Sequence, residues 1–61
     1  MEEMPLHKPL LARLGESLDL SLIVVDSVEG DQLNIREHLY HNTWAHLTIN
    51  RNLVKEWKPT H

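Results

Sequence analysis

Two arginines, one near each end of the chain, are the side chains that most directly suggest a ligand-binding site. Arg13 lies in a short apolar run, and Arg51 closely follows an alternating one. Taken singly, an arginine at a strand edge is a solvated charge. Arginine also donates paired hydrogen bonds to guanine edges and phosphates, and apolar neighbours such as Leu10 and Ile49 can support an unstacked base. If the two runs lie side by side, they indicate a small nucleic-acid site.

Three histidines in the second half of the chain are the candidate metal ligands. His38 and His41 are three residues apart, and His46 follows. That spacing puts two imidazoles on one face of a helix but on opposite faces of a strand. A zinc site needs four ligands, or three and a water, and Glu37 or Asp31 would have to complete it. Because the segment leads into a strand-like pattern, we interpret the histidines as solvated and expect no metal or cofactor.

Catalytic motifs are missing from the sequence. No serine or threonine stands in a recognisable nucleophile-base motif, and there is no HExxH zinc motif. The two glycines of the chain are too few for a glycine-rich phosphate loop. We therefore expect a binding protein rather than an enzyme.

The chain has 61 residues, a net charge of −3 and no cysteine. A chain this short forms one domain of marginal stability, so we expect self-association. Its negative charge counts against nonspecific coating of nucleic acids. No apolar run approaches the roughly 20 residues of a membrane helix, and the first residues are acidic, unlike a signal peptide. We expect a cytoplasmic protein with no membrane partner.

The apolar pattern divides the chain into an arm and one β-rich domain. Residues 1–9 are acidic, contain two prolines and predict an N-terminal arm, and residues 10–58 predict the domain. Residues 10–14 fit either an edge strand or one helical turn.

A hairpin over residues 17–36 is the clearest prediction. Leucines alternate with polar residues from Leu18 to Leu22, β-branched residues follow, and the turn signal lies around Gly30. The alternation predicts that Leu18, Leu20 and Leu22 face the core.

The C-terminal part predicts a further strand and a short helix. Residues 36–43 are ambiguous, whereas residues 44–49 alternate as a strand with Trp44 on the face opposite its aliphatic residues. The spacing within residues 53–57 predicts a short helix that Pro59 ends. Trp57 is expected in the core or a dimer interface, and Trp44 there or stacked on a base.

Three blocks of sequence resemble the carbon storage regulator (CsrA/RsmA) family of RNA-binding proteins. Residues 13–18 resemble its opening Arg-x-Gly-Glu-Thr/Ser motif, residues 23–35 its central hairpin, and residues 47–51 its last strand. The blocks occur in the family's order, and the resemblance covers about residues 10–57.

The resemblance implies a fold of five antiparallel strands and a short C-terminal helix. It further implies an intertwined homodimer in which the first strand of one copy lies beside the last strand of the other. Two equivalent sites for GGA-containing hairpin loops of mRNA or small RNA would result, making the protein a translational regulator. Position by position, the implied RNA-binding residues are Leu10, Arg13, Leu47, Ile49 and Arg51.

Departures from the family pattern leave a second hypothesis open. The family carries two adjacent arginines in its first strand, whereas this chain has Ala12 before Arg13. Its net charge is negative, and an acidic arm precedes the first strand. The alternative is a small β-rich protein-interaction module, such as an inhibitor or a diverged member without RNA binding.

Overall fold

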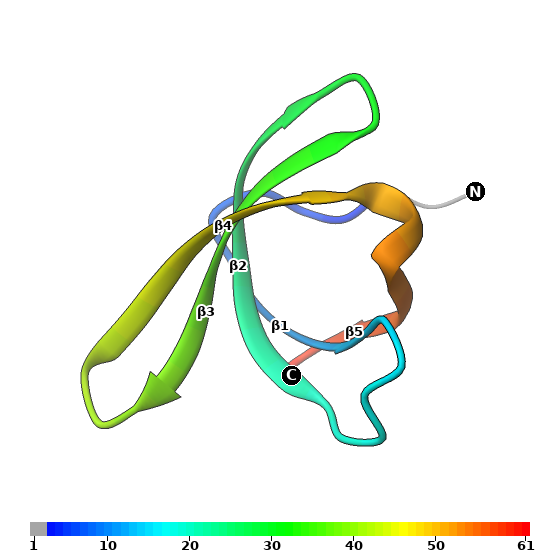
Figure 1. The fold of residues 1–61 in the computed structure, drawn as a ribbon. Helices are drawn as coiled ribbons and strands as arrows, with labels where there is room; N and C mark the ends of the chain where they lie inside the picture. The colour runs from blue at the N-terminus through cyan, green and yellow to red at the C-terminus, as the bar shows by residue number, and fades with distance from the viewer. Residues whose placement is uncertain (1–2) are drawn as a thin grey trace.

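Five antiparallel strands form one sheet in the computed structural model, which describes residues 3–61. They are β1 (Pro9–Leu14), β2 (Ser21–Glu29), β3 (Gln32–Tyr40), β4 (Thr43–Asn50) and β5 (Val54–Pro59), with the 3-10 turn η1 (Arg51–Leu53) before the last strand. Their order across the sheet is β4-β3-β2-β1-β5. The first and last strands are therefore neighbours, and Figure 1 shows the sheet twisting strongly along its length.

The core lies on one face of this sheet and comes from residues two apart on three neighbouring strands. Such spacing is what a strand with one buried face requires. Met4 of the N-terminal segment joins the same cluster, and Ile49 and Trp57 pack against it. The fully or almost fully buried strand residues are Leu10, Ala12, Ile23, Val25, Leu33 and Ile35.

The predicted hairpin is confirmed in β2 and β3, with its turn at Gly30, whose φ is 61°. The prediction for the first part of the segment is wrong. Residues 15–20 form a loop, so β2 begins at Ser21, and its most buried side chains are Ile23 and Val25 rather than Leu22. The leucine alternation assigned Leu22 to the buried face of the strand. In the structure the buried face is the one that carries Ile23 and Val25, because a shift of one residue turns the other face toward the core.

The ambiguous segment belongs to a second hairpin. β3 continues to Tyr40, and a two-residue turn with His41 at a φ of 52° leads into β4. The predicted strand over residues 44–49 is confirmed as the middle of β4. Pairing of His38 with Trp44 and of Leu33 with Ile49 also confirms that Trp44 lies on the face opposite Ile49.

The predicted C-terminal helix is wrong. Among the described residues only η1 is helical. There the Asn50 side chain accepts a hydrogen bond from the Asn52 N–H at 2.8 Å, and Val54 begins strand β5. Ala12 pairs with Trp57, and Leu14 with Val54 across a bulge. Helical spacing within five residues is weak evidence, and pairing with the free edge of β1 satisfies more backbone groups than one helical turn.

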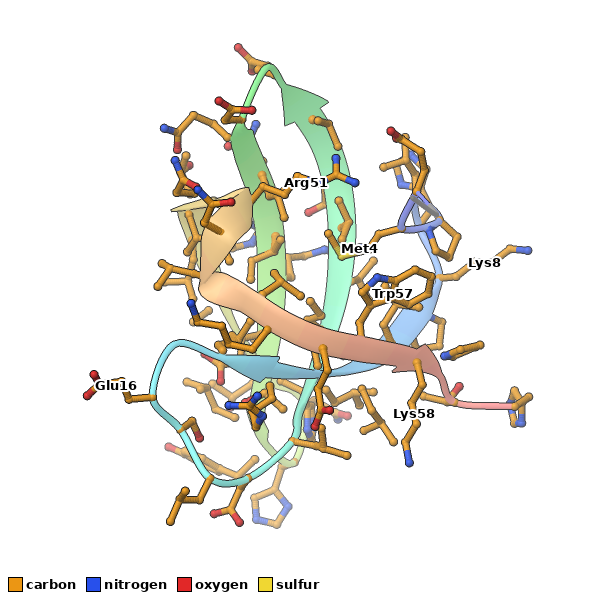
Figure 2. The ribbon with its side chains drawn as sticks, turned by 90° about the vertical axis from the view of Figure 1, so that its right-hand side faces the viewer. Met4, Lys8, Glu16, Arg51, Trp57 and Lys58 are labelled. Carbon is orange, nitrogen blue, oxygen red and sulfur yellow. The ribbon has the colours of Figure 1, made fainter. Side chains whose placement is uncertain are left out.

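The N-terminal segment packs on the domain over residues 3–8, whereas residues 1 and 2 of the predicted arm lie outside the described part. Met4 is buried, and the His7 N–H donates to the Val25 carbonyl at 2.8 Å. Figure 2 shows Met4 directed toward the same interior as Trp57. The segment thus contributes to the core rather than extending from it.

Both edges of β1 are occupied within one chain. β2 pairs with one edge and β5 with the other. The resemblance placed the neighbour of the first strand in a second copy, so strand exchange would have to open a pairing that the single chain already makes. The homodimer itself stays a prediction.

Candidate functional site

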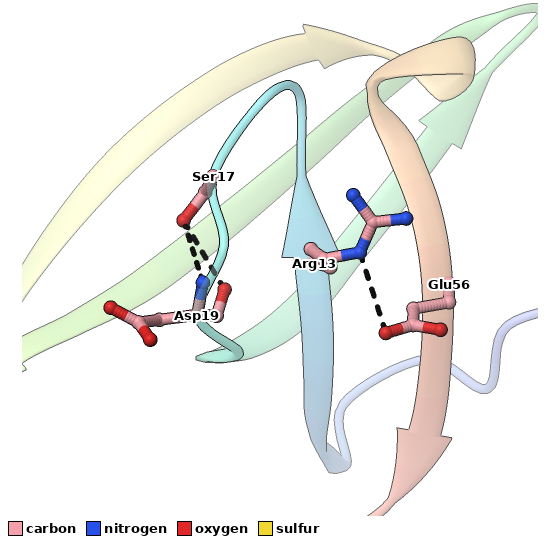
Figure 3. Close-up of polar contacts among 4 residues, drawn as sticks. All are labelled: Arg13, Ser17, Asp19 and Glu56. Carbon is pink, nitrogen blue, oxygen red and sulfur yellow. Dashed lines mark hydrogen bonds and ion pairs between the residues drawn. The ribbon is translucent and has the colours of Figure 1, made fainter.

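The residues implied as an RNA site do not come together within the chain. Leu10 is fully buried in the core, with 0% of its surface exposed, so in the single chain it presents no surface to a ligand. Arg13 lies on the opposite face of β1, and its Nε is 3.4 Å from an Oε1 oxygen of Glu56 on β5 (Figure 3). The two positions therefore face opposite sides of the sheet.

The other implied residues lie at the far edge of the sheet. Leu47 and Ile49 are on β4, separated from β1 by two strands, and point toward the core side. Ile49 packs on the core, and Leu47 is 36% exposed. Arg51 begins η1, where its N–H donates to the Asp31 carbonyl at 2.7 Å. Within a single chain these residues and Arg13 do not share one surface, and the site that the resemblance implies between two copies stays a prediction.

Each of the three arginines has a carboxylate partner. Arg36 makes the closest pair, with Nε and Nη2 each 3.0 Å from an oxygen of Asp26 on β2. Arg13 is paired with Glu56, and Arg51 lies 3.9 Å from Glu3. In the last two pairs the carboxylate is exposed, so the pairs are weak. They still offset positive charge at the positions where an RNA phosphate would need it.

The histidines belong to the β3–β4 hairpin. His38 Nε2 is hydrogen-bonded to the His41 carbonyl at 2.5 Å, and its ring meets Trp44 edge-on at 4.9 Å. His46 pairs with Arg36 across the strands and is exposed. Within residues 3–61 no group of three or more His, Asp or Glu side chains is close enough to hold a metal ion.

An aromatic and basic surface covers the outward face of β3 and β4. Arg36, His38, Trp44 and His46 share this face through cross-strand pairing. The Arg36 guanidinium lies 5.9 Å from the centre of the Trp44 ring, a cation–π distance. A flat ring beside a planar cation is one arrangement on which a base or an aromatic side chain can stack.

The loop of residues 15–20 presents the most exposed large apolar side chain in the described chain. Leu18 is 94% exposed, whereas a strand in the predicted position would have buried it. The loop is anchored at its start, where the Gly15 N–H donates to the Leu53 carbonyl at 2.7 Å. Gly15 has a φ of +56°, which a residue with a side chain adopts only with strain.

Hydrogen bonds also define the tip of this loop. The Ser17 N–H donates to the Leu14 carbonyl at 3.0 Å. The Ser17 hydroxyl accepts from the Asp19 N–H at 3.3 Å and donates to the Asp19 carbonyl at 3.2 Å (Figure 3). Leu18 is therefore held outward between two residues that bond to each other.

Next to the loop lies a small surface pocket of about 130 Å³. Leu20, which is 41% exposed, lines it from the loop, and Leu11 lines it from β1. Glu56, Trp57 and Lys58 of β5 complete the lining. Trp57 is half-buried and packs against the core, while a dimer interface at its exposed part stays a prediction. We call Leu11, Leu18, Leu20 and this pocket the loop patch.

The loop patch was not predicted from the sequence, because the alternation of Leu18, Leu20 and Leu22 with polar residues is also typical of a strand. A signal against a strand was present in the same residues. Gly15 opens the segment, Ser17 and Asp19 are residues that bond locally to the backbone, and β-branched residues start only at Ile23. Reading these residues together would have predicted a turn-rich loop.

Comparison with protein-family models, with curated proteins and with solved structures finds no match for the chain. In residues 3–61 no helix is long and apolar enough to span a membrane. Any functional assignment must therefore be argued from the geometry of the chain.

Proposed function

We propose that the chain is a small β-rich module that binds a protein partner through the loop patch and performs no catalysis. The observation that carries this proposal is the 94% exposure of Leu18 in a loop with defined internal hydrogen bonds. A singly exposed leucine is ordinary on a protein surface. Here Leu18 shares its loop with exposed Leu20, and an open pocket lies beside Leu20.

The charges around the patch define the chemistry of its partner. Glu16 and Asp19 flank Leu18 in the loop, and Glu56 lines the pocket. A complementary surface would offer an apolar cavity for Leu18 with basic groups at its rim. The net charge of −3 supports the same kind of partner. A chain without cysteine fits a reducing compartment, so the proposal includes a cytoplasmic location.

Site-specific photo-crosslinking tests this proposal in the cell that produces the protein. A photoreactive phenylalanine analogue would replace Leu18 and, as a matched control, exposed Asn52 of η1. We expect a protein adduct from position 18 that position 52 does not form. With that partner purified, Leu18→Ser should weaken binding about ten-fold or more in calorimetry. Identical adducts from both positions, or unchanged binding by Leu18→Ser, would refute the proposal.

RNA binding is the second candidate, because Trp44 lies on one face with Arg36, His38 and His46. Such a face suits an unpaired base, and the resemblance to the carbon storage regulators suggests GGA hairpin loops as ligand and translational regulation as role. Against it stand the net negative charge and the carboxylate partner of every arginine. These charges make RNA the less favoured ligand.

Fluorescence anisotropy with two variants distinguishes the two candidate RNA-binding sites, the β3–β4 face and the site implied by the family resemblance. The ligands are a short hairpin with GGA in its loop and the same hairpin with the loop scrambled, each at two salt concentrations. If the β3–β4 face binds RNA, Trp44→Ala should weaken binding by about 1–3 kcal/mol, the range for stacking on one base. If the implied family site operates instead, Arg51→Ala should cost a similar amount, about 1–3 kcal/mol. Equal, weak binding of both hairpins would discard this candidate.

A further inference from the structure

The two edges of the sheet differ in how they are protected against pairing. Strand β5, at one edge, carries Lys55, Glu56, Lys58 and Pro59 among its six residues. Strand β4, at the other edge, has the sequence Thr-Trp-Ala-His-Leu-Thr-Ile-Asn, without Asp, Glu, Lys, Arg or Pro. Charged residues and proline are the usual means by which edge strands avoid pairing with another chain. Only β5 has this protection.

The free edge of β4 is long and accessible. β4 pairs with β3 from Gln32–Asn50 to Tyr40–Thr43, and in residues 3–61 no strand pairs with its other edge. Its side chains are exposed or half-buried along the whole strand, and Leu47 is 36% exposed. Alternate backbone N–H and C=O groups of an edge strand point outward and can accept a further strand.

We infer that β4 pairs with β4 of a second copy in antiparallel orientation, so that two sheets join into one. A two-fold axis perpendicular to the sheet keeps each face continuous across the junction. Ala45, Leu47 and Ile49 then meet the same residues of the partner, and Trp44 lies on the other face with His46, Thr48 and Asn50 of the two copies. Because β4 contains no carboxylate, ammonium or guanidinium, every such register avoids like charges opposite each other.

The residues of β4 favour pairing with β4 of a second copy over pairing with a strand of another protein. Charged residues on a pairing strand favour a partner of opposite sign and disfavour the strand's own copy. β4 lacks any such residue, and its apolar residues meet apolar residues when it faces itself. A junction of one eight-residue strand is small, so we expect a weak dimer that depends on concentration. This inference concerns another surface than the loop patch and does not rest on the proposed function.

Sedimentation of three variants tests the inference. Thr48 is exposed on β4 and donates one hydrogen bond, to Asn34 at 2.7 Å. Thr48→Lys places a charge at the junction, and Thr48→Val removes the same hydrogen bond without adding charge. Asn52→Lys adds the same charge on η1, outside the strand.

From about 10 μM to about 1 mM, the unaltered chain, Thr48→Val and Asn52→Lys should shift toward twice the chain mass. Thr48→Lys should stay monomeric and keep the circular dichroism of the unaltered chain. A monomeric unaltered chain at the highest concentration, or a Thr48→Lys variant that dimerises equally, would overturn the inference.

Hydrogen exchange keeps the test decisive if Thr48→Lys fails to fold. In the unaltered chain, the outward amides of β4 should exchange at least several-fold more slowly at the highest concentration than at the lowest. Amides of β5 serve as the internal control and should not change. Concentration-independent exchange along β4 would overturn the inference, as would slowing confined to β5.

Discussion

At the scale of single residues, the burial of Leu10 and of Leu18 is the reverse of what the sequence predicted. Leu10 was expected to contact a ligand and lies fully buried, whereas Leu18 was expected in a buried strand face and is 94% exposed. The apolar run around Leu10 is too short for its pattern to identify a face. Around Leu18 the pattern is regular, but local hydrogen bonds of Ser17 and Asp19 replace the strand.

Truncating Leu10 should therefore lower the stability of the fold far more than truncating Leu18. Leu10→Ala should lower the free energy of unfolding by about 2–5 kcal/mol, because it leaves a cavity in the core. Leu18→Ala should change it by less than about 0.5 kcal/mol. Urea titration followed by tryptophan fluorescence measures both values, and a similar loss in the two variants would contradict the assigned burial.

The ion pairs should also differ in strength. Arg36 and Asp26 make paired hydrogen bonds on side chains that are about one-third exposed, with fractions of 36% and 33%. We expect Asp26→Asn to cost about 1–2 kcal/mol of stability. Glu56→Gln, which alters the single exposed contact with Arg13, should cost less than about 0.5 kcal/mol. Equal losses in the two variants would show that the Arg36–Asp26 pair has no special role.

At the scale of elements, the sequence was sufficient for what depends on local patterning. The β2–β3 turn at Gly30 and the strand that became β4 were both predicted, because turn residues and alternation act over a few neighbours. The start of β2 and the nature of β5 were not. The start of β2 is set by the local hydrogen bonds of Ser17 and Asp19, which the leucine alternation concealed. The nature of β5 depends on pairing with β1, a partner distant in sequence.

The face assignment of β2 gives a direct test at this scale. Ile23 lies in the core, whereas Leu22 is half-buried on the other face, where it pairs with Leu11. Ile23→Asp should unfold the chain, with a loss above about 4 kcal/mol, because a charge would be buried without a partner. Leu22→Asp should remain folded, with a loss of about 1–2 kcal/mol. Thermal melting by circular dichroism distinguishes them, and unfolding by Leu22→Asp alone would restore the sequence-based face.

At the scale of the whole molecule, the pairing of β1 with β5 decides where a binding site can lie. It completes the five-stranded sheet within one chain, places Arg13 beside Glu56 and leaves the loop patch next to the two strands. The composite RNA site was predicted from residues of two runs that were assumed to be neighbours. Local patterns show that strands exist but do not specify which strands pair, so the candidate site could not be derived without the topology.

Isotope-filtered nuclear Overhauser spectroscopy tests most directly whether β1 and β5 pair within one chain. Labelled and unlabelled chains would be unfolded together in equal amounts and refolded, so that any exchanged strands could mix. Backbone protons of Ala12 and Trp57, which are paired across β1 and β5, should give a contact in the labelled chain alone and none between labelled and unlabelled chains. A contact between the two kinds of chain would show that β5 is exchanged between copies and would contradict the pairing of β1 with β5 within one chain.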